Sequence, residues 1–521
     1  MKSLNKYKQI IITLVVIVSA NTYVSAQTDS SYYFSPFFEL YNTWINSDNV
    51  AGYQYFEDAD FTEVKATLSS YSGDFSSSYS PRNSNAYSVD ILGHRKINGI
   101  SYYGLISFES QKKESVKWSY LMNSNTGTPY IIGDSIAGDF NNERFKLFGG
   151  VSGNLFTDRV KFGLSVDYYT SIGAKNKDPR SLNRYIDIAL CPSFVFQISK
   201  SFRVGLASGY SFKREAIKIG SFSDSKENIF YFKGLGFMSS FTSLEQVNRK
   251  YFTEVRSISL QSQYIVDDFM SHLDVKFSYL EDVVEDGHNV IKPEFYYENQ
   301  NIDITSLSKI VTGDYVSKVK LKLNYVEGVG EVSVLKSMID GGSYNWSEVG
   351  VNKDYTNDNL NVELEYLLKK SFNYIGLDCT YNKSNEEYYF SPSTFYQRYS
   401  NLIFGVQMSG GIEINKSRLS LSSRISTRIN SSKENYLLDD ENSLEFNIPK
   451  SSDFIISDLA NNEFLYNTTN YIKYNFSLKY DVLVELVKQS RNMYVVLDYT
   501  GLNAESSLEN HYISLSLGLK L

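Results

Sequence analysis

Hydrophobic and polar residues alternate one by one over much of the chain. Between Ile472 and Leu486, one face carries Phe476 and Leu478 and the other carries Lys473 and Ser477. Similar segments occur at 273–279, 318–325 and 360–368. Because successive side chains of a strand point to opposite faces, this pattern predicts β-strands with one apolar and one hydrophilic side.

Three features favour a membrane-spanning barrel over a soluble β-sandwich. The hydrophilic face is charged in some strands and small in others, as at Gly163 and in the run Gly205, Ala207 and Gly209. Tight turns such as Asn98-Gly99 alternate with long polar connections, as in outer-membrane barrels. The long connections are expected around 113–140, 217–250, 287–312 and 433–469. The chain also ends on an alternating strand, which can close against the first one and remove both sheet edges.

The alternating segments from Phe61 to Leu521 number about 18. Weak candidates near 61–72, 251–264 and 330–337 leave 14 or 16 strands as alternatives. We therefore predict an all-β fold, a transmembrane antiparallel β-barrel with short periplasmic turns and long extracellular loops, over residues 61–521. Residues 27–60 precede it and are expected to form an N-terminal periplasmic or plug segment.

The N-terminus has the three parts of a secretory signal. Lys2, Lys6 and Lys8 form a basic region, residues 10–20 an apolar core, and Val24-Ser25-Ala26 a cleavage motif. We expect residues 1–26 to be a cleaved signal peptide and the protein to reach the outer membrane. Its partners there would be outer-membrane lipid and the barrel-assembly machinery.

Composition narrows the class of protein further. The 521 residues include 43 Tyr, aromatics reach 15%, and the formal net charge is −8. A mean hydropathy of −0.30 disfavours a polytopic helical membrane protein, the aromatic content disfavours disorder, and the acidic balance disfavours nucleic-acid binding. Tyr is stable where hydrocarbon meets headgroups and is also a good strand former, so an interfacial girdle and plain strand propensity both explain its abundance.

The sequence contains few residue patterns that could form an enzyme active site. Among its four His, His94 shares a strand face with Ser88 and Asp90, but three residues along one strand are too far apart for a triad. Zinc spacings and phosphate or dinucleotide fingerprints are missing from the sequence. We expect no enzymatic activity, no metal and no cofactor.

Charged residues on hydrophilic strand faces are the best candidates for a functional role. Columns of like charge facing a pore can set solute selectivity, whereas pairing with acids on neighbouring strands would instead fill the lumen. The lumen-lining candidates are Lys318, Lys320, Lys322, Glu363, Glu365, Arg424, Arg428, Lys479 and Asp481.

Two loop motifs resemble a known family. The stretch Ile131 to Asp139, with sequence IIGDSIAGD, and the tripeptide Asp178-Pro179-Arg180 resemble an uncharacterised family of Bacteroidota outer-membrane β-barrels, a domain of unknown function. The motif loop residues are Asp134, Asp139, Asp178 and Arg180. The resemblance implies a barrel over nearly the whole mature chain and no catalytic residues. Asn49-Val50-Ala51-Gly52 is similar to an Asn-Pro-Ala-Gly stretch of fatty-acid-transporter-like barrels, with Val50 in place of Pro.

Together these patterns predict a passive channel or uptake route for a small solute that the sequence does not name. The alternative is a non-conducting accessory barrel that docks an envelope protein partner, such as a surface lipoprotein, an active transporter or a secretion complex. The sequence leaves open whether the lumen is wet or filled by residues 27–60 and inward loops.

Overall fold

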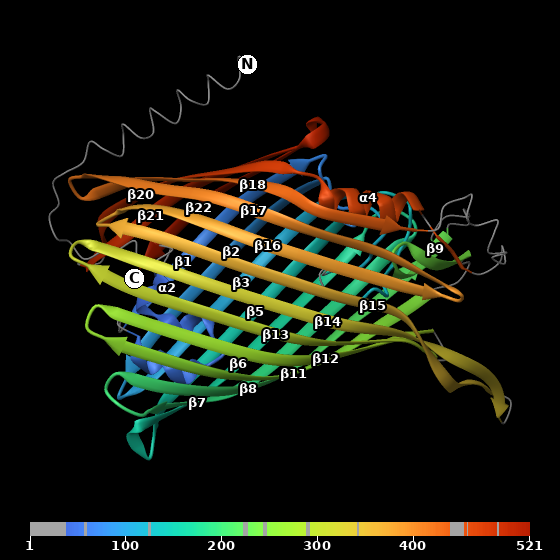
Figure 1. The fold of residues 1–521 in the computed structure, drawn as a ribbon, viewed down its shortest axis with the longest axis horizontal. Coiled ribbons are helices and arrows are strands. Elements are labelled where there is room, and N and C mark those ends of the chain that lie inside the picture. Colours follow the sequence, from blue (N-terminus) through green and yellow to red (C-terminus); the bar gives the residue numbers. More distant parts are fainter. Residues whose placement is uncertain are drawn as a thin grey trace.

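The protein is a closed antiparallel β-barrel, shown in Figure 1. The computed structural model describes residues 38–56, 60–122, 127–221, 228–242, 247–287, 292–340, 343–437, 453–455, 457–486 and 489–520. Eighteen strands form one sheet, and the first pairs with the last over Glu63–Gly73 and Asn510–Lys520. The predicted fold class is therefore confirmed, at the strand number that the alternation favoured. The expected signal peptide lies outside the described residues.

The barrel strands are 12 to 28 residues long. In chain order they are β1 (Phe61–Gly73), β2 (Asn83–Ile97), β3 (Ile100–Val116), β5 (Gly138–Leu155), β6 (Thr157–Lys175), β7 (Arg180–Gln197), β8 (Phe202–Gly220), β11 (Val247–Val266), β12 (Phe269–Asp286), β13 (Lys292–Thr312), β14 (Tyr315–Asp340), β15 (Ser343–Lys370), β16 (Asn373–Phe390), β17 (Ser393–Ile414), β18 (Ser417–Tyr436), β20 (Tyr471–Leu486), β21 (Gln489–Ala504) and β22 (Glu509–Lys520). A membrane crossing needs only about 10 residues of a tilted strand, so most strands extend beyond a bilayer.

The two ends of the barrel differ as expected. At the turn end, described connections have one to four residues, such as Asn98-Gly99, whose positive φ values of 51° and 81° suit a tight hairpin. The other end, the loop end, carries the long connections 117–137, 221–246 and 437–470. One expectation was wrong, because residues 292–312 form β13 and not a long connection. The weak strand candidate at 330–337 is strand, but it continues β14 and is not a separate strand.

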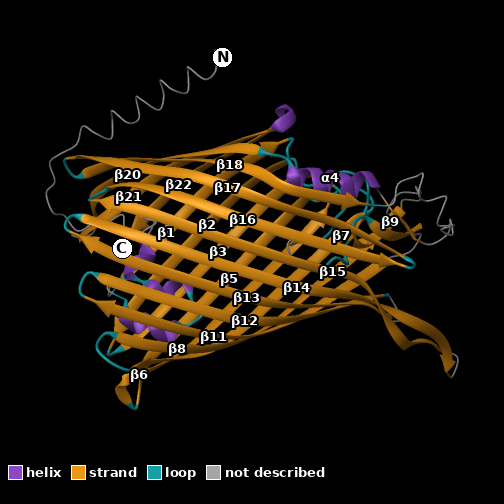
Figure 2. Ribbon diagram, viewed as in Figure 1, coloured by secondary structure: helices purple, strands orange, loops and turns teal. Residues whose placement is uncertain are grey.

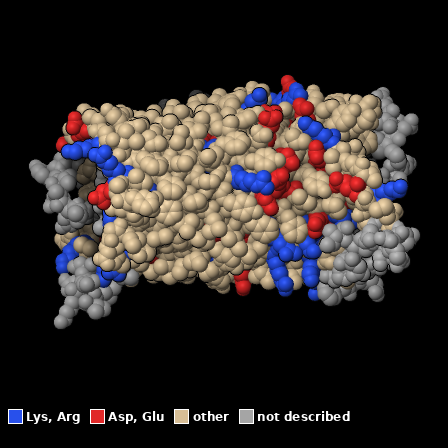
Figure 3. Space-filling view, turned by 90° about the horizontal axis from the view of Figure 1, so that it is seen from below, with Lys and Arg blue, Asp and Glu red and all other residues tan. Residues whose placement is uncertain are grey.

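The outward face of the barrel carries an apolar band. In Figure 3 a nearly uncharged region crosses the visible face, with Lys, Arg, Asp and Glu gathered on either side. Five outward leucines stand in register across β18, β20, β21, β22 and β1 and are all exposed. This leucine row consists of Leu421, Leu478, Leu497, Leu515 and Leu68. Exposed aliphatic side chains in such a row are stable against hydrocarbon and not against water, which identifies the band as the membrane-facing surface.

Short elements lie within or over the barrel, as Figure 2 shows. At the turn end are α2 (Phe38–Tyr41), η2 (Thr43–Asn46) and η3 (Val50–Tyr55). At the loop end, β19 (Asp453–Ile455), β10 (Phe237–Thr242), β9 (Asn228–Gly234) and β4 (Ile132–Gly133) form a small second sheet in that order. The longest helix of the described ranges is α4 (Ser457–Thr468), and no described helix combines the length and hydropathy of a membrane span. The remaining short helix is η4 (Glu505–Ser507).

Candidate functional site: the barrel lumen

Polar side chains from five adjacent strands, four of which contribute charged groups, line one part of the lumen. Lys318, Lys320 and Lys322 take alternate positions of β14, so all three point inward, and Glu365 and Glu363 of β15 stand opposite the last two. A cavity of about 420 Å³, here called the β14 cavity, lies in front of them. Its polar lining includes Lys320, Lys322, Glu363, Glu365, Asp378, Thr380, Gln407 and Arg424.

Most of these cations are paired with acids of neighbouring strands. The Lys318 ammonium lies 2.5 Å from Glu365, and the Lys322 ammonium 3.9 Å from Glu363. Arg424 of β18 reaches across β17 and donates two hydrogen bonds, of 3.0 and 2.6 Å, to Asp378 of β16. The charged columns therefore hold one another in place, and their net charge is much smaller than the sequence pattern alone implies.

The other lumen candidates have local roles at some distance from this cavity. Arg428 donates from Nε to the carbonyl of Thr469 at 2.8 Å and from Nη2 to the carbonyl of Tyr466 at 2.7 Å, which fixes the end of α4 to the barrel wall. Lys479 pairs with Asp481 two residues further along β20, at 2.9 Å. The nine candidates thus do not form one site.

The N-terminal segment, residues 38–56, lies inside the barrel at the turn end, where Figure 2 shows its helices. Glu39 is its point of contact with the β14 lysines. One carboxylate oxygen lies 2.5 Å from the Lys318 ammonium, and the other contacts Lys320 and the side-chain amide of Asn46. Burial alone would raise the pKa of Glu39, but the two ammonium groups hold it below its ordinary value of 4.5.

Buried hydrogen bonds hold the rest of the segment in the lumen. Trp44, 1% exposed, donates from its indole to Gln263 at 3.2 Å. Asn49 is fully buried and donates to the carbonyl of Phe194 and to Gln261, both at 2.9 Å. The small wall residues make this approach possible, because a Cβ atom at Gly205 would lie 2.7 Å from both side chains.

A second cavity, of about 520 Å³, separates the N-terminal segment from the opposite part of the wall. It is charged as well. Asp48 of the segment pairs with Lys276 of β12 at 2.7 Å, and Lys146 pairs with Asp167 at 3.1 Å between β5 and β6. We call it the N-terminal cavity. The described residues therefore line two polar cavities in the lumen, one bounded by the N-terminal segment and one that begins at Lys320, which contacts the segment.

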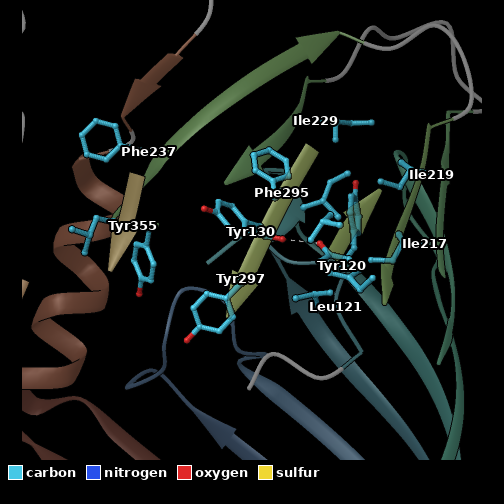
Figure 4. Packing of buried hydrophobic residues seen from close by; sticks show 14 of the residues in the cluster. Tyr120, Leu121, Tyr130, Ile217, Ile219, Ile229, Phe237, Phe295, Tyr297 and Tyr355 are labelled. Atoms are coloured by element: carbon cyan, nitrogen blue, oxygen red, sulfur yellow. Dashed lines mark hydrogen bonds between the residues drawn. The ribbon is translucent and has the colours of Figure 1, made fainter. Parts of the chain in front are cut away.

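Inward loops fill the loop end of the lumen. The loop plug consists of the described residues of 117–137 and 228–242. Many of its apolar side chains form a buried cluster with residues of the wall (Figure 4), and Phe230, Phe232 and Met238 form a second one with Leu459 of α4. Tyr130 is fully buried and stacks on Phe295 of β13 with ring centroids 4.6 Å apart. Phe237 of β10 stacks on Tyr388 of β16 at 4.1 Å. These aromatic side chains are almost inaccessible to water.

Arg249 of β11 anchors the loop plug to the wall. Its side chain is fully buried and donates two hydrogen bonds, of 2.7 and 2.5 Å, to Asp286 of β12. Its third nitrogen donates to the carbonyl of Ile131 at 3.3 Å, and the Tyr251 hydroxyl donates to the carbonyl of Tyr130 at 2.9 Å. Sequence reasoning missed Arg249, because a lone Arg at a strand end is not distinguished from surface charge.

The two loop motifs meet in the structure. The Lys175 ammonium contacts Asp134 at 2.5 Å, and both side chains are almost completely buried. The Tyr120 hydroxyl donates to Asp134 and lies 3.4 Å from the carbonyl of Pro179, so the stretch 131–139 and the tripeptide 178–180 share one buried contact. This arrangement gives the motif a structural purpose, the attachment of the loop plug to β6 and β7.

The three remaining motif residues form more exposed ion pairs. Asp139 accepts from Lys112 at 3.3 Å, and Asp178 pairs with Arg180 at 3.0 Å. Partly exposed pairs of this kind contribute at most about 1 kcal/mol each. Asp134 is therefore the motif residue that contributes most to holding the loop plug in place.

Comparisons with known proteins give a family and distant likenesses. A model of the family of unknown function DUF6850 matches residues 50–521. A search of curated proteins finds no match. The chain is similar to the outer membrane transporter YddB from Escherichia coli, with 8% identity, coverage of 89% of this chain and 81% of that one, and a TM-score of 0.41. It is also similar to the siderophore receptor PiuA from Acinetobacter baumannii, with 9% identity, coverage of 89% and 82%, and a TM-score of 0.39. A third similar structure is OccAB3 from Acinetobacter baumannii, with 8% identity, coverage of 89% and 99%, and a TM-score of 0.33. Structural similarities this distant do not identify a function for this chain.

Proposed function

Because the chain belongs to DUF6850, a family of unknown function, membership assigns no activity, and we propose a function from the lumen itself. The protein is an outer-membrane barrel that takes up a small solute by a passive route, and the route opens when the N-terminal segment moves. The motif resemblance supports an origin among the Bacteroidota, and the basic, apolar and cleavage-site residues of 1–26 support export by a cleaved signal peptide. Barrel-assembly machinery would insert it.

The observation that carries this proposal is the filling of the lumen. The N-terminal segment occupies the turn end, the loop plug occupies the loop end, and two polar cavities of about 420 and 520 Å³ lie beside the segment. A purely structural filling would leave no charged space of that size, whereas an open pore would lack the two plugs. Chambers between movable segments are suited to a gated route.

Asn49 gives a direct test of the gate. Replacing Asn49 by Ala removes the hydrogen bonds of a fully buried side chain to Phe194, Leu206 and Gln261. Such losses cost roughly 1–3 kcal/mol, which shifts the docking equilibrium of the segment roughly 5- to 150-fold. We expect N49A to show far more frequent channel openings in planar lipid bilayers than the wild type.

A matched control distinguishes gating from general damage. Asn475 also faces the lumen, but its side chain donates to Thr500 within the wall, at 2.9 Å. N475A should therefore conduct as the wild type does. If folded N49A shows no conductance above that of N475A, the uptake proposal is wrong.

One feature favours the alternative of an accessory barrel. The β14–β15 hairpin projects from the loop end in Figure 1 and carries exposed apolar side chains. Val334, Met338, Val349 and Val351 are 40 to 62% exposed. An envelope protein partner could pack on them. The alternative is supported if neither N49A nor the wild type conducts and if shortening the hairpin abolishes a complex with another envelope protein.

A further inference from the structure

We infer that Glu39 occupies a binding site for a carboxylate and that a carboxylate-bearing solute competes with it for Lys318 and Lys320. This inference rests on the proposed uptake function and names the chemical class of the solute. The N-terminal segment would then act as a tethered stand-in for the solute, held in the site until the solute replaces it.

The contacts of Glu39 are those of a recognised ligand. Each carboxylate oxygen has its own cation on β14, Lys318 for one and Lys320 for the other. The Lys318 side chain is 3% exposed and that of Glu39 is 13% exposed, so the pair is screened little by water. Charge-assisted hydrogen bonds to both oxygens are how proteins distinguish a carboxylate from a neutral group.

The β14 cavity supplies independent evidence that a ligand larger than a side-chain carboxylate fits here. The cavity begins at Lys320 and has a volume of about 420 Å³. Thr380 and Gln407 line it and offer neutral hydrogen-bonding groups. A solute whose carboxylate contacts the two lysines would place its remaining atoms in this space.

The charges of the wall also favour an anion once Glu39 leaves. Lys318, Lys320, Lys322 and Arg424 contribute four cations, whereas Glu363, Glu365 and Asp378 contribute three anions. Glu39 is the fourth anion at this place, and it comes from the N-terminal segment and not from a strand. Its departure therefore leaves an excess positive charge that a carboxylate neutralises.

Competition of this kind has a measurable consequence. A site that is free in only a fraction of the molecules binds its ligand more weakly by that same fraction. If Glu39 is docked in nine molecules of ten, removing its charge should tighten binding about tenfold. The full chain, folded in detergent, can be titrated with potassium succinate as a probe by isothermal calorimetry, with potassium chloride at equal ionic strength as the reference.

We expect Glu39→Gln to bind succinate at least about tenfold more tightly than the wild type. In the Glu39→Gln background, Lys320→Gln should abolish the gain. Lys479→Gln should retain it, because Lys479 faces the lumen on β20 but pairs with Asp481 and not with the segment. The neutral analogue succinamide should not bind in any of them.

A second route to the same state guards against a misfolded variant. N49A frees the segment without changing any charge, and it should also tighten succinate binding. The carboxylate inference is overturned if neither variant gains affinity for succinate, or if succinamide binds equally well. Conductance of N49A in that case would leave the uptake proposal intact, so the two failures are distinguishable.

Discussion

Leu478 gives the sharpest test of which face of the barrel meets lipid. It is the second member of the leucine row, on β20, and is 41% exposed. Its neighbours across both strands, Leu421 and Leu497, are also outward leucines, so no carboxylate lies beside it to pair with a new cation. A Lys at the bilayer midplane of a barrel costs about 2–4 kcal/mol.

The adjacent residue Ser477 provides the matched control. It faces the lumen and stands opposite Asp498 of β21, which can pair with an introduced ammonium. We expect Leu478→Lys to lower the free energy of unfolding by about 2–4 kcal/mol, roughly 30- to 700-fold in the folding equilibrium. Ser477→Lys should cost less than about 1 kcal/mol.

Guanidinium unfolding of the barrel in phospholipid vesicles, followed by tryptophan fluorescence, measures both free energies. Equal losses of unfolding free energy in the two variants would refute the assignment of the lipid-facing and lumen-facing sides. A larger loss for Ser477→Lys would reverse it and place the charged columns on the lipid side.

Two further predictions concern the plugs. Because its pKa is lowered, Glu39 stabilises docking of the N-terminal segment fully above its ordinary pKa of 4.5 and loses this effect as the pH falls through the lowered value. Acid should therefore release the segment from Lys318 and Lys320. Trp fluorescence should show this transition in the wild type and not in Glu39→Gln. An identical acid response in the two proteins would contradict the prediction. Arg249→Met should lower the free energy of unfolding by about 3–5 kcal/mol, because it leaves Asp286 charged and buried. Adding Asp286→Asn should recover part of this loss in the same unfolding measurement. A loss below about 1 kcal/mol for Arg249→Met would show that the pair is solvated.

The fold was predictable because a barrel repeats one short-range signal. Alternation at Leu478 and Ser477 depends only on the two-residue period of a strand, and the same period predicts one shared face for Lys318, Lys320 and Lys322. Connection lengths were less certain. The polar first half of 292–312 resembles a loop, yet the whole stretch forms β13, and the exposed Ile302 and Ile310 of its second half belong to the outward apolar face.

The candidate site was only partly predictable, because its contacts join distant parts of the chain. Glu39 and Lys320 are 281 residues apart, and their meeting depends on barrel closure and on the entry of the N-terminal segment. The cross-strand pair of Lys322 with Glu363 follows from a hairpin register and could be anticipated. The contact of Arg249 with a loop carbonyl could not, because backbone acceptors leave no trace in the sequence.

The pairing of β1 with β22 sets an order of events for the newly made protein. Lys65 stands opposite Gly518 in this pairing, so the ring of hydrogen-bonded strands stays open until the last strand is in place. The N-terminal segment lies just before β1, and its contacts with β7, β8 and β11 do not involve that seam. An open sheet can curl around the segment, whereas a finished cylinder would have to admit it through one mouth. The seam between the first and last strands is thus where assembly either encloses the segment or leaves it outside.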